Sequence, residues 1–140
     1  MNLGLNTERI DAMQHTSKGP APGFATHPGY EIQLTPINKT VRVFLGDAVV
    51  AESRAAIELI EGGYPPRYYV PMSDVRAQAL TPNQHSTHCP FKGDASYWTV
   101  NVAGQSIENG AWSYVEPFDE CVSVAGYVSF YGEKLSITLS

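Results

Sequence analysis

The chain is poor in charge. Its 140 residues hold 9 Lys and Arg against 14 Asp and Glu, so the formal net charge is −5 and only 16% of residues are charged. The basic residues are scattered singly, whereas binding to nucleic acid or to an anionic membrane needs clustered Lys and Arg. We therefore expect neither a nucleic acid nor a membrane among the partners of this protein.

The chain also lacks a long apolar run and has only two cysteines. No window holds the roughly 18 apolar residues that a membrane-spanning helix needs. The first residues, MNLGLNTERIDAMQH, mix acidic, basic and polar side chains and so lack the apolar core of a signal peptide. Cys89 and Cys121 do not make the repeated spacing of a secreted disulfide framework. These absences predict a cytoplasmic protein.

Motifs of several enzyme and metal-site classes are missing. There is no GxSxG, HExxH, GxxxxGK[ST] or GxGxxG pattern, which excludes the common hydrolase, zinc-protease and nucleotide-binding signatures. His85, His88, Cys89 and Cys121 could supply four zinc ligands, but His88 and Cys89 are adjacent and no CxxC pair is present. We expect no metal site and no cofactor.

Short alternating segments dominate what is present. Hydrophobic residues make up 43% of the chain, enough for one domain with a core of its own. In several stretches apolar residues recur at every second position, with turn-forming residues between the stretches. The alternation predicts strands in the stretches 41–45, 48–53, 67–70, 95–102, 105–109, 127–131 and 134–140.

The turn residues and one ambiguous stretch refine this assignment. Gly46 with Asp47, and Ala103 with Gly104, fit two-residue turns between neighbouring strands. Residues 54–60 fit both a strand and a helix, and we leave that alternative open.

Helical signals are few. Residue 73 or 74 is expected to cap a short helix that ends near Leu80. Residues 1–20 form an irregular N-terminal lead-in, with docking expected from Pro22 onward, and residues 21–140 form a single domain. The predicted fold class is mostly β, with small antiparallel sheets in a tent or partly open barrel-like arrangement and one or two short helices.

The densest cluster of reactive groups is HSTHCPFKG, residues 85–93, which we expect to form a loop. It brings a thiol, Cys89, close to the ammonium of Lys92. A nearby positive charge can stabilise a thiolate and make it a nucleophile. The alternative is that Cys89 is a small buried hydrophobic residue, as free cysteines commonly are.

Several ordered blocks resemble one known family. The blocks APGFATHP, VRVFLGDAVVAES, YPPRYYVP followed by SDV, THCPFKGDASYW, AWSYVEPF and AGYVSFY resemble the bacterial and fungal family called domain of unknown function 427, from about Ala21 to Tyr131. The resemblance implies a β-tent, two small antiparallel sheets that meet at an apex. Similar zinc proteins pin that apex with CxxC knuckles, which are absent here. A nucleotidyltransferase-like label also goes with the family, but no Gly-Ser followed by paired aspartates is present, so we do not transfer that activity.

The resemblance also implies a set of site residues. The family's pattern falls on Glu52, Ser53, Tyr68, Tyr69, Pro71, Cys89, Lys92, Gly93, Tyr97, Trp112, Tyr114 and Tyr131. Polar and aromatic side chains of this kind are typical of a pocket lining. We predict a ligand site from these residues, Pro71 excepted, together with Arg67 and His88, and Cys89 is the candidate catalytic residue.

Three functions from different classes follow. The leading hypothesis is a small-molecule-binding domain, with enzymatic activity left open and the pocket between the two sheets. Lys92 would bind an anionic or carbonyl group, Tyr69, Tyr97 and Trp112 would stack on a ligand, and Glu52 would accept hydrogen bonds. The alternatives are a protein-interaction module that uses exposed aromatic residues and a thiol redox sensor at Cys89.

Overall fold

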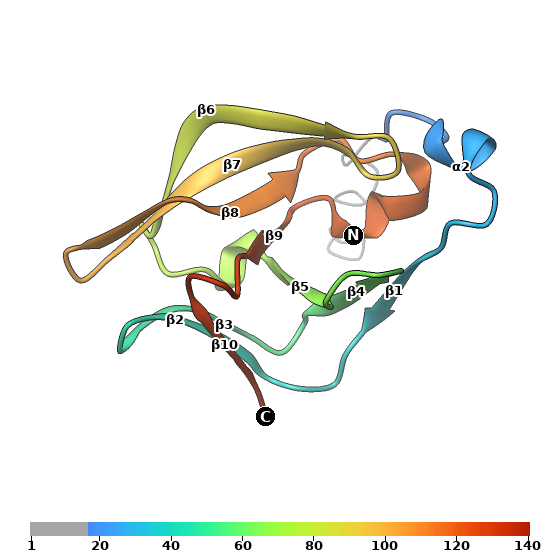
Figure 1. The fold of residues 1–140 in the computed structure, drawn as a ribbon. Coiled ribbons are helices and arrows are strands. Elements are labelled where there is room, and N and C mark those ends of the chain that lie inside the picture. The colour runs from blue at the N-terminus through green and yellow to red at the C-terminus, as the bar shows by residue number, and fades with distance from the viewer. Residues whose placement is uncertain (1–16) are drawn as a thin grey trace, which may run out of the picture.

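The computed structural model describes residues 17–140, which build two antiparallel sheets (Figure 1). One sheet has seven strands in the order β1-β4-β5-β9-β8-β7-β6, and the other has three in the order β10-β2-β3. The predicted fold class, mostly β with few short helices, is confirmed. The elements are α2 (Gly23–Thr26), β1 (Ile32–Pro36), β2 (Val41–Leu45), β3 (Ala48–Ser53), β4 (Ile57–Glu61), β5 (Arg67–Pro71), the 3-10 helix η1 (Met72–Asp74), β6 (Leu80–Cys89), β7 (Gly93–Val102), β8 (Gln105–Tyr114), the 3-10 helix η2 (Asp119–Val124), β9 (Tyr127–Phe130) and β10 (Ser136–Leu139).

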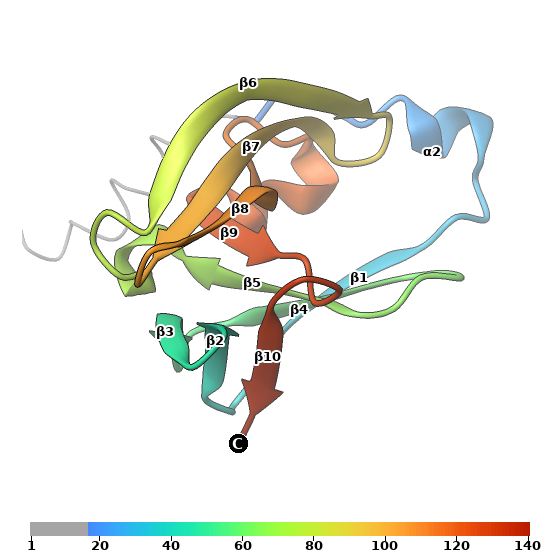
Figure 2. The same ribbon diagram turned by 60° about the vertical axis from the view of Figure 1, so that its left-hand side comes forward.

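The large sheet is bent, so that β6, β7 and β8 arch over the half formed by β5, β4 and β1 (Figures 1 and 2). The register of β7 against both neighbours shifts near Trp98, where β6 and β8 each carry extra residues. Bulges of this kind bend and twist a strand. The two bulges are joined, because the Asn83 side-chain amide donates a hydrogen bond of 2.7 Å to Asn109 Oδ1.

Side chains hold the bent sheet partly closed. Lys92 lies in the turn between β6 and β7, and Glu61 lies at the end of β4, the strand next to β1 at the other end of the strand order. Their side chains form an ion pair with an Nζ–Oε1 distance of 2.6 Å. An ion pair therefore joins the two distant parts of the bent sheet where no strand pairing does so.

Two clusters of buried side chains lie on opposite faces of the large sheet. The first fills the space between the two sheets and includes Val41, Val43, Val50, Val70, Val100, Val128 and Phe130. The second lies on the inner face of the bend and includes Ile57, Leu59, Tyr69, Trp112, Tyr114, Cys121 and Val124. A fully buried side chain of this size contributes about 1.5–3 kcal/mol, so both clusters hold the fold together.

Both turn predictions are confirmed. Gly46 begins its turn with a φ of 62°, and Ala103 and Gly104 have φ values of 51° and 77°. The positive φ at both Ala103 and Gly104 is what a type I′ hairpin turn requires, whereas the Gly46–Asp47 turn has a positive φ only at its first central residue, as in type II′. The undecided stretch 54–60 is also settled, because most of it lies in β4.

The helix predicted from residue 73 or 74 to Leu80 is wrong. Only η1, Met72–Asp74, is helical there, and the chain turns at Gln78, whose φ is 68°. Asp74 accepts a hydrogen bond of 2.6 Å from the Ser53 hydroxyl, so its carboxylate is engaged with β3. A helix of this length gains little from its own hydrogen bonds, and Met72, Val75 and Ala79 pack against the core without one.

The reactive cluster at residues 85–93 does not form the expected loop. Residues 85–89 belong to β6, residue 93 begins β7, and only residues 90–92 make the turn. β1 is an additional strand that the sequence analysis did not identify.

The N-terminal lead-in lies mostly outside the described residues, but its last part is docked. The backbone N–H of Lys18 donates to the Pro117 carbonyl at 3.1 Å, and that of Gly23 to the Pro90 carbonyl at 3.0 Å. Docking therefore begins before Pro22. Within residues 17–140, no helix is long and apolar enough to cross a membrane.

Candidate functional site

A cavity of about 300 Å³ lies inside the bend of the large sheet. Both halves of the sheet contribute to its walls, and we call it the aromatic cavity. It is lined by Leu59, Glu61, Tyr64, Pro65, Arg67, Tyr69, Cys89, Lys92, Tyr97, Trp112, Tyr114 and Tyr131. Its volume reaches the lower end of the range for small-molecule sites. We expected the pocket between the two sheets, and the bend of the larger sheet holds this one instead.

The Lys92–Glu61 ion pair forms one wall of this cavity. Both side chains are largely buried, with exposed fractions of 12% and 13%. The second oxygen of the carboxylate, Oε2, accepts a hydrogen bond from the Tyr30 hydroxyl. Burial and this contact with Glu61 raise the pKa of Tyr30 well above its usual range. Tyr30 therefore stays protonated and fixes the carboxylate from the side opposite Lys92.

Aromatic rings supply much of the remaining wall. Trp112 Nε1 donates a hydrogen bond of 3.0 Å to the Tyr69 hydroxyl, and the two rings meet edge to face. Burial raises the pKa values of Tyr69 and Tyr114 far above the ordinary tyrosine range, and that of Tyr131 to about 12. These hydroxyls are neutral at physiological pH, so they can both donate to a ligand and accept from it.

Arg67 places a positive charge against these rings. Its guanidinium carbon lies 5.3 Å from the Trp112 ring centroid and 5.4 Å from that of Tyr131, within cation–π range. Its Nη1 is also 3.3 Å from the carboxylate of Glu133, whose side chain is 61% exposed. The charged residues that line the cavity are thus Lys92 and Arg67 against Glu61, an excess of one positive charge.

The two cysteines occupy different environments. Cys89 is half-buried and lines the aromatic cavity, in the same hairpin as Lys92. Cys121 is fully buried, its thiol is 3.9 Å from the Phe91 carbonyl oxygen, and burial raises its pKa to about 12. Of the two, Cys121 is the buried small hydrophobe, and Cys89 is the thiol that a ligand in the cavity could meet.

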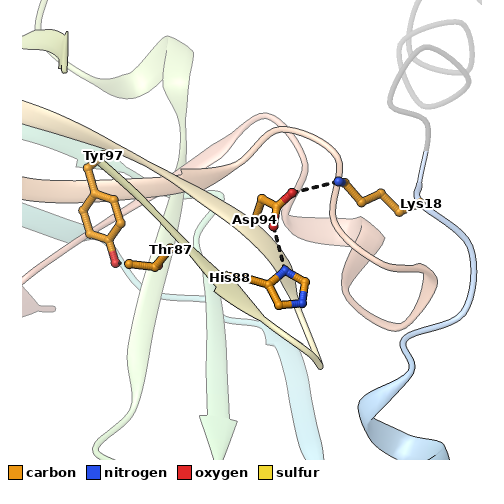
Figure 3. Close-up of polar contacts among 5 residues, drawn as sticks. All are labelled: Lys18, Thr87, His88, Asp94 and Tyr97. Carbon is orange, nitrogen blue, oxygen red and sulfur yellow. Dashed lines mark hydrogen bonds and ion pairs between the residues drawn. The ribbon is translucent and has the colours of Figure 1, made fainter. Parts of the chain in front are cut away.

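The outer face of the same hairpin fastens the N-terminal segment. Asp94 accepts a hydrogen bond of 2.8 Å from Lys18 and pairs at 2.7 Å with His88 Nδ1 (Figure 3). The hydrogen bonds from Lys18 and His88 lower the pKa of Asp94. On the inner face, the hydroxyls of Thr87 and Tyr97 lie 3.1 Å apart, which orients the Tyr97 ring. Because successive side chains of a strand point to opposite faces, the residues that bind the N-terminal segment lie on the outer face and those that orient Tyr97 lie on the inner face.

Eight of the predicted site residues line the aromatic cavity, and five do not. Those that line it are Arg67, Tyr69, Cys89, Lys92, Tyr97, Trp112, Tyr114 and Tyr131. Of the others, His88 is 59% exposed on the outer face of the hairpin. Gly93 has a structural role, since its φ is 124° and a Cβ there would lie 3.3 Å from the Glu116 carbonyl oxygen.

The remaining three predicted residues belong to other parts of the fold. Glu52 lies on β3 in an exposed ion pair, 3.5 Å from Arg42. Ser53 is buried beside it, where its hydroxyl donates to Asp74. Tyr68 points to the face of β5 opposite Tyr69, as the alternation predicts, and its hydroxyl donates to Glu58 at 3.2 Å.

The acceptor role expected of Glu52 falls to Glu61. The sequence analysis did not select Glu61 as a site residue, since its pairing with Lys92 depends on the sheet order. Its place at the end of a strand, next to the Gly62–Gly63 turn, carried no signal of that contact. Among residues 17–140, no three His, Cys, Asp or Glu side chains lie close enough together to hold a metal ion.

A family model matches most of the chain. The model of the family described as "Domain of unknown function (DUF427)" matches residues 33–140, a range that includes every residue lining the aromatic cavity. No curated protein matches the chain.

Proposed function

Since the chain belongs to the DUF427 family, whose description assigns no activity, we propose its function from the geometry of the aromatic cavity. The protein binds a small molecule that carries a planar ring and an anionic or carbonyl group. The observation that carries this proposal is the Arg67 guanidinium, which lies over the Trp112 and Tyr131 rings in the wall of a cavity rich in aromatic side chains.

The aromatic wall favours a planar ligand. The rings of Trp112 and Tyr131 are 4.4 Å apart and tilted by 42°, and Tyr97 lines the same cavity. Aromatic contacts with favourable geometry contribute about 0.5–1.5 kcal/mol beyond the area that they bury. A ring placed in the cavity would meet several such faces at once.

The charge balance favours an anion or a carbonyl oxygen. Lys92 and Glu61 neutralise each other, whereas the partner of Arg67 is an exposed and therefore well-screened carboxylate. The positive charge of Arg67 is thus the one at the cavity that is least neutralised by a protein carboxylate. At an effective dielectric constant of about 20, a unit charge 4 Å from another contributes about 4 kcal/mol, enough to set the order of affinity of otherwise equal ligands.

Binding of benzoate, benzamide and benzamidinium tests this proposal, because the three share a ring and differ in charge. The two tryptophans give two indole N–H signals in ¹⁵N spectra. The signal that disappears in the variant Trp98→Phe is assigned to Trp98. Trp112 lines the cavity, while Trp98 packs on the opposite face of the sheet and serves as the internal control. We expect the Trp112 signal to shift, with benzoate binding at least about tenfold more tightly than benzamidinium.

Two results would count against the proposal. Equal dissociation constants for the three ligands would remove the role of Arg67, and a Trp112 signal that none of them shifts would remove the binding site. The protein-interaction and thiol-sensor alternatives remain predictions, as do the cytoplasmic location and the absence of nucleic-acid and membrane partners. A concave cavity with converging polar groups favours ligand binding over these alternatives.

A further inference from the structure

A second cavity, of about 270 Å³, lies between the two sheets. We call it the inter-sheet cavity. Its walls include the rings of Tyr68 and Phe130 from the large sheet and Ile137 from β10 of the small sheet. Pro65 and Arg67 line both this cavity and the aromatic cavity, so the two spaces adjoin.

Both cavities lie beside the end of the pairing between β5 and β9. Strands β5 and β9 pair from Pro71 with Tyr127 to Tyr69 with Ser129, and the pairing stops there. Arg67 and Tyr131 lie beyond the last pair, on the two sides of the gap. Arg67, which lines both cavities, therefore lies where β5 and β9 are not paired.

Arg67 lies at this junction and contacts both sides. Its guanidinium stacks on Trp112 and Tyr131 in the aromatic cavity, and its hydrogen bond goes to Glu133, which lines the inter-sheet cavity. Among the described residues, Glu133 supplies the only oxygen that accepts a hydrogen bond from this guanidinium. Most of its N–H donors can therefore bind ligand oxygens, and their planar arrangement matches a carboxylate.

We propose that one elongated ligand occupies both cavities, an inference that rests on the proposed function. Its aromatic ring lies in the aromatic cavity, its carboxylate binds Arg67 at the junction, and a short aliphatic chain extends into the inter-sheet cavity. Alone, each cavity lies near or below the smallest volume of typical small-molecule sites, whereas the joined space falls within their range. The ligand class is an aromatic carboxylic acid with an apolar chain on the far side of the carboxylate.

N-acyl-phenylalanines provide matched probes, because the ring and the carboxylate stay constant while the chain grows. Acetyl, butanoyl and hexanoyl members are titrated into protein carrying ¹⁵N-labelled indole and ¹³C-labelled isoleucine methyl groups. We expect every member to shift Trp112 and the longer ones to shift Ile137 at the same ligand concentrations. Affinity should rise about fourfold per buried methylene until the inter-sheet cavity is full.

Gly132→Leu is the matched variant. Gly132 lines the inter-sheet cavity, its φ lies outside the left-handed region, and a Cβ there would lie 3.7 Å from Ile137 Cδ1. The leucine should fill the cavity, abolish the dependence on chain length and leave benzoate binding unchanged. Ile137→Phe fills the same space from the opposite sheet and replaces Gly132→Leu if that variant fails to fold.

Either of two results of the chain-length series would overturn the inference. One is an affinity that does not change with chain length, and the other is the same chain-length dependence in wild type and in the filled variant. If benzoate shifts Trp112 and no N-acyl-phenylalanine does, the elongated ligand is excluded and the proposed function stands. If benzoate also leaves Trp112 unchanged, both proposals fall.

Discussion

Replacing Lys92 with Met tests how strongly the ion pair with Glu61 holds the bent sheet closed. Methionine keeps much of the apolar stem but removes the ammonium. The Glu61 carboxylate, 13% exposed, is then left with the Tyr30 hydroxyl as its hydrogen-bond donor among the described residues. Removing one partner of a buried pair costs about 3–5 kcal/mol, and the remaining bond moderates the loss. We expect the free energy of unfolding to fall by about 3 kcal/mol.

A double-mutant cycle in urea measures the interaction itself. Lys92→Met, Glu61→Gln and the double variant are compared with wild type by equilibrium unfolding. With a slope of about 2 kcal/mol per molar urea, Lys92→Met should lower the midpoint by about 1.5 M. The double variant has no unpaired buried charge, so it should be no less stable than Lys92→Met. The coupling energy is then at least as large as the cost of Glu61→Gln alone, for which we expect about 2 kcal/mol or more.

The Lys18–Asp94 pair supplies the control. Its distance, 2.8 Å, is close to that of the buried pair, but its side chains are 37% and 53% exposed. Exposed pairs couple by about 0.2–1 kcal/mol, and added salt weakens them further. If the Lys92–Glu61 coupling were as small and as sensitive to salt as the control, the ion pair would not be what closes the sheet.

Three further predictions concern single residues. Iodoacetamide should modify Cys89 at neutral pH and leave Cys121 unmodified until the protein unfolds, because Cys121 is fully buried and burial raises its pKa to about 12. Mass spectrometry of peptides measures the labelling, and equal labelling of both cysteines would contradict this prediction. Gly93→Ala should lower the free energy of unfolding by about 1–3 kcal/mol, because Gly93 combines a φ of 124° with a close backbone neighbour. Gly29 has open space around it, so the control variant Gly29→Ala should change the free energy of unfolding by no more than about 0.5 kcal/mol. Burial raises the pKa of Tyr131 from 10.0 to about 12. The stability that its neutral hydroxyl contributes is therefore present below pH 10 and lost as the pH rises toward 12. Between about pH 10 and 12 the urea midpoint of Tyr131→Phe should fall less than that of wild type.

Strands with a buried face were predictable, and strands without one were not. In β2 the alternation of Val41, Val43 and Leu45 marks the buried side, and Gly46 marks the turn that follows. β6 is an edge strand whose residues are mostly exposed on both faces, so no apolar period identifies it. It even contains Pro82, which an edge strand tolerates because the missing N–H need not pair.

The site was predictable by residue type but not by position. Aromatic residues, Lys92 and Cys89 were all identified as candidates, since such side chains are common in pockets. The hydrogen-bond acceptor was expected at Glu52, because the pattern of the resembled family falls on that residue, whereas Glu61 is the carboxylate that lines the cavity. Only the order of the strands decides which of them meets Lys92, and that order is a property of the whole sheet.

The bend of the large sheet connects these findings. Extra residues in β6 and β8 lie on both sides of β7 near Trp98, and the bond from Asn83 to Asn109 ties them together. The resulting arch carries the turn that holds Lys92 over the distant end of β4, where Glu61 meets it. The aromatic rings line the space under this arch because alternation turns them to the inner face. The cavity is thus a product of bulges and one ion pair, and a flat sheet with the same lining residues would not enclose it.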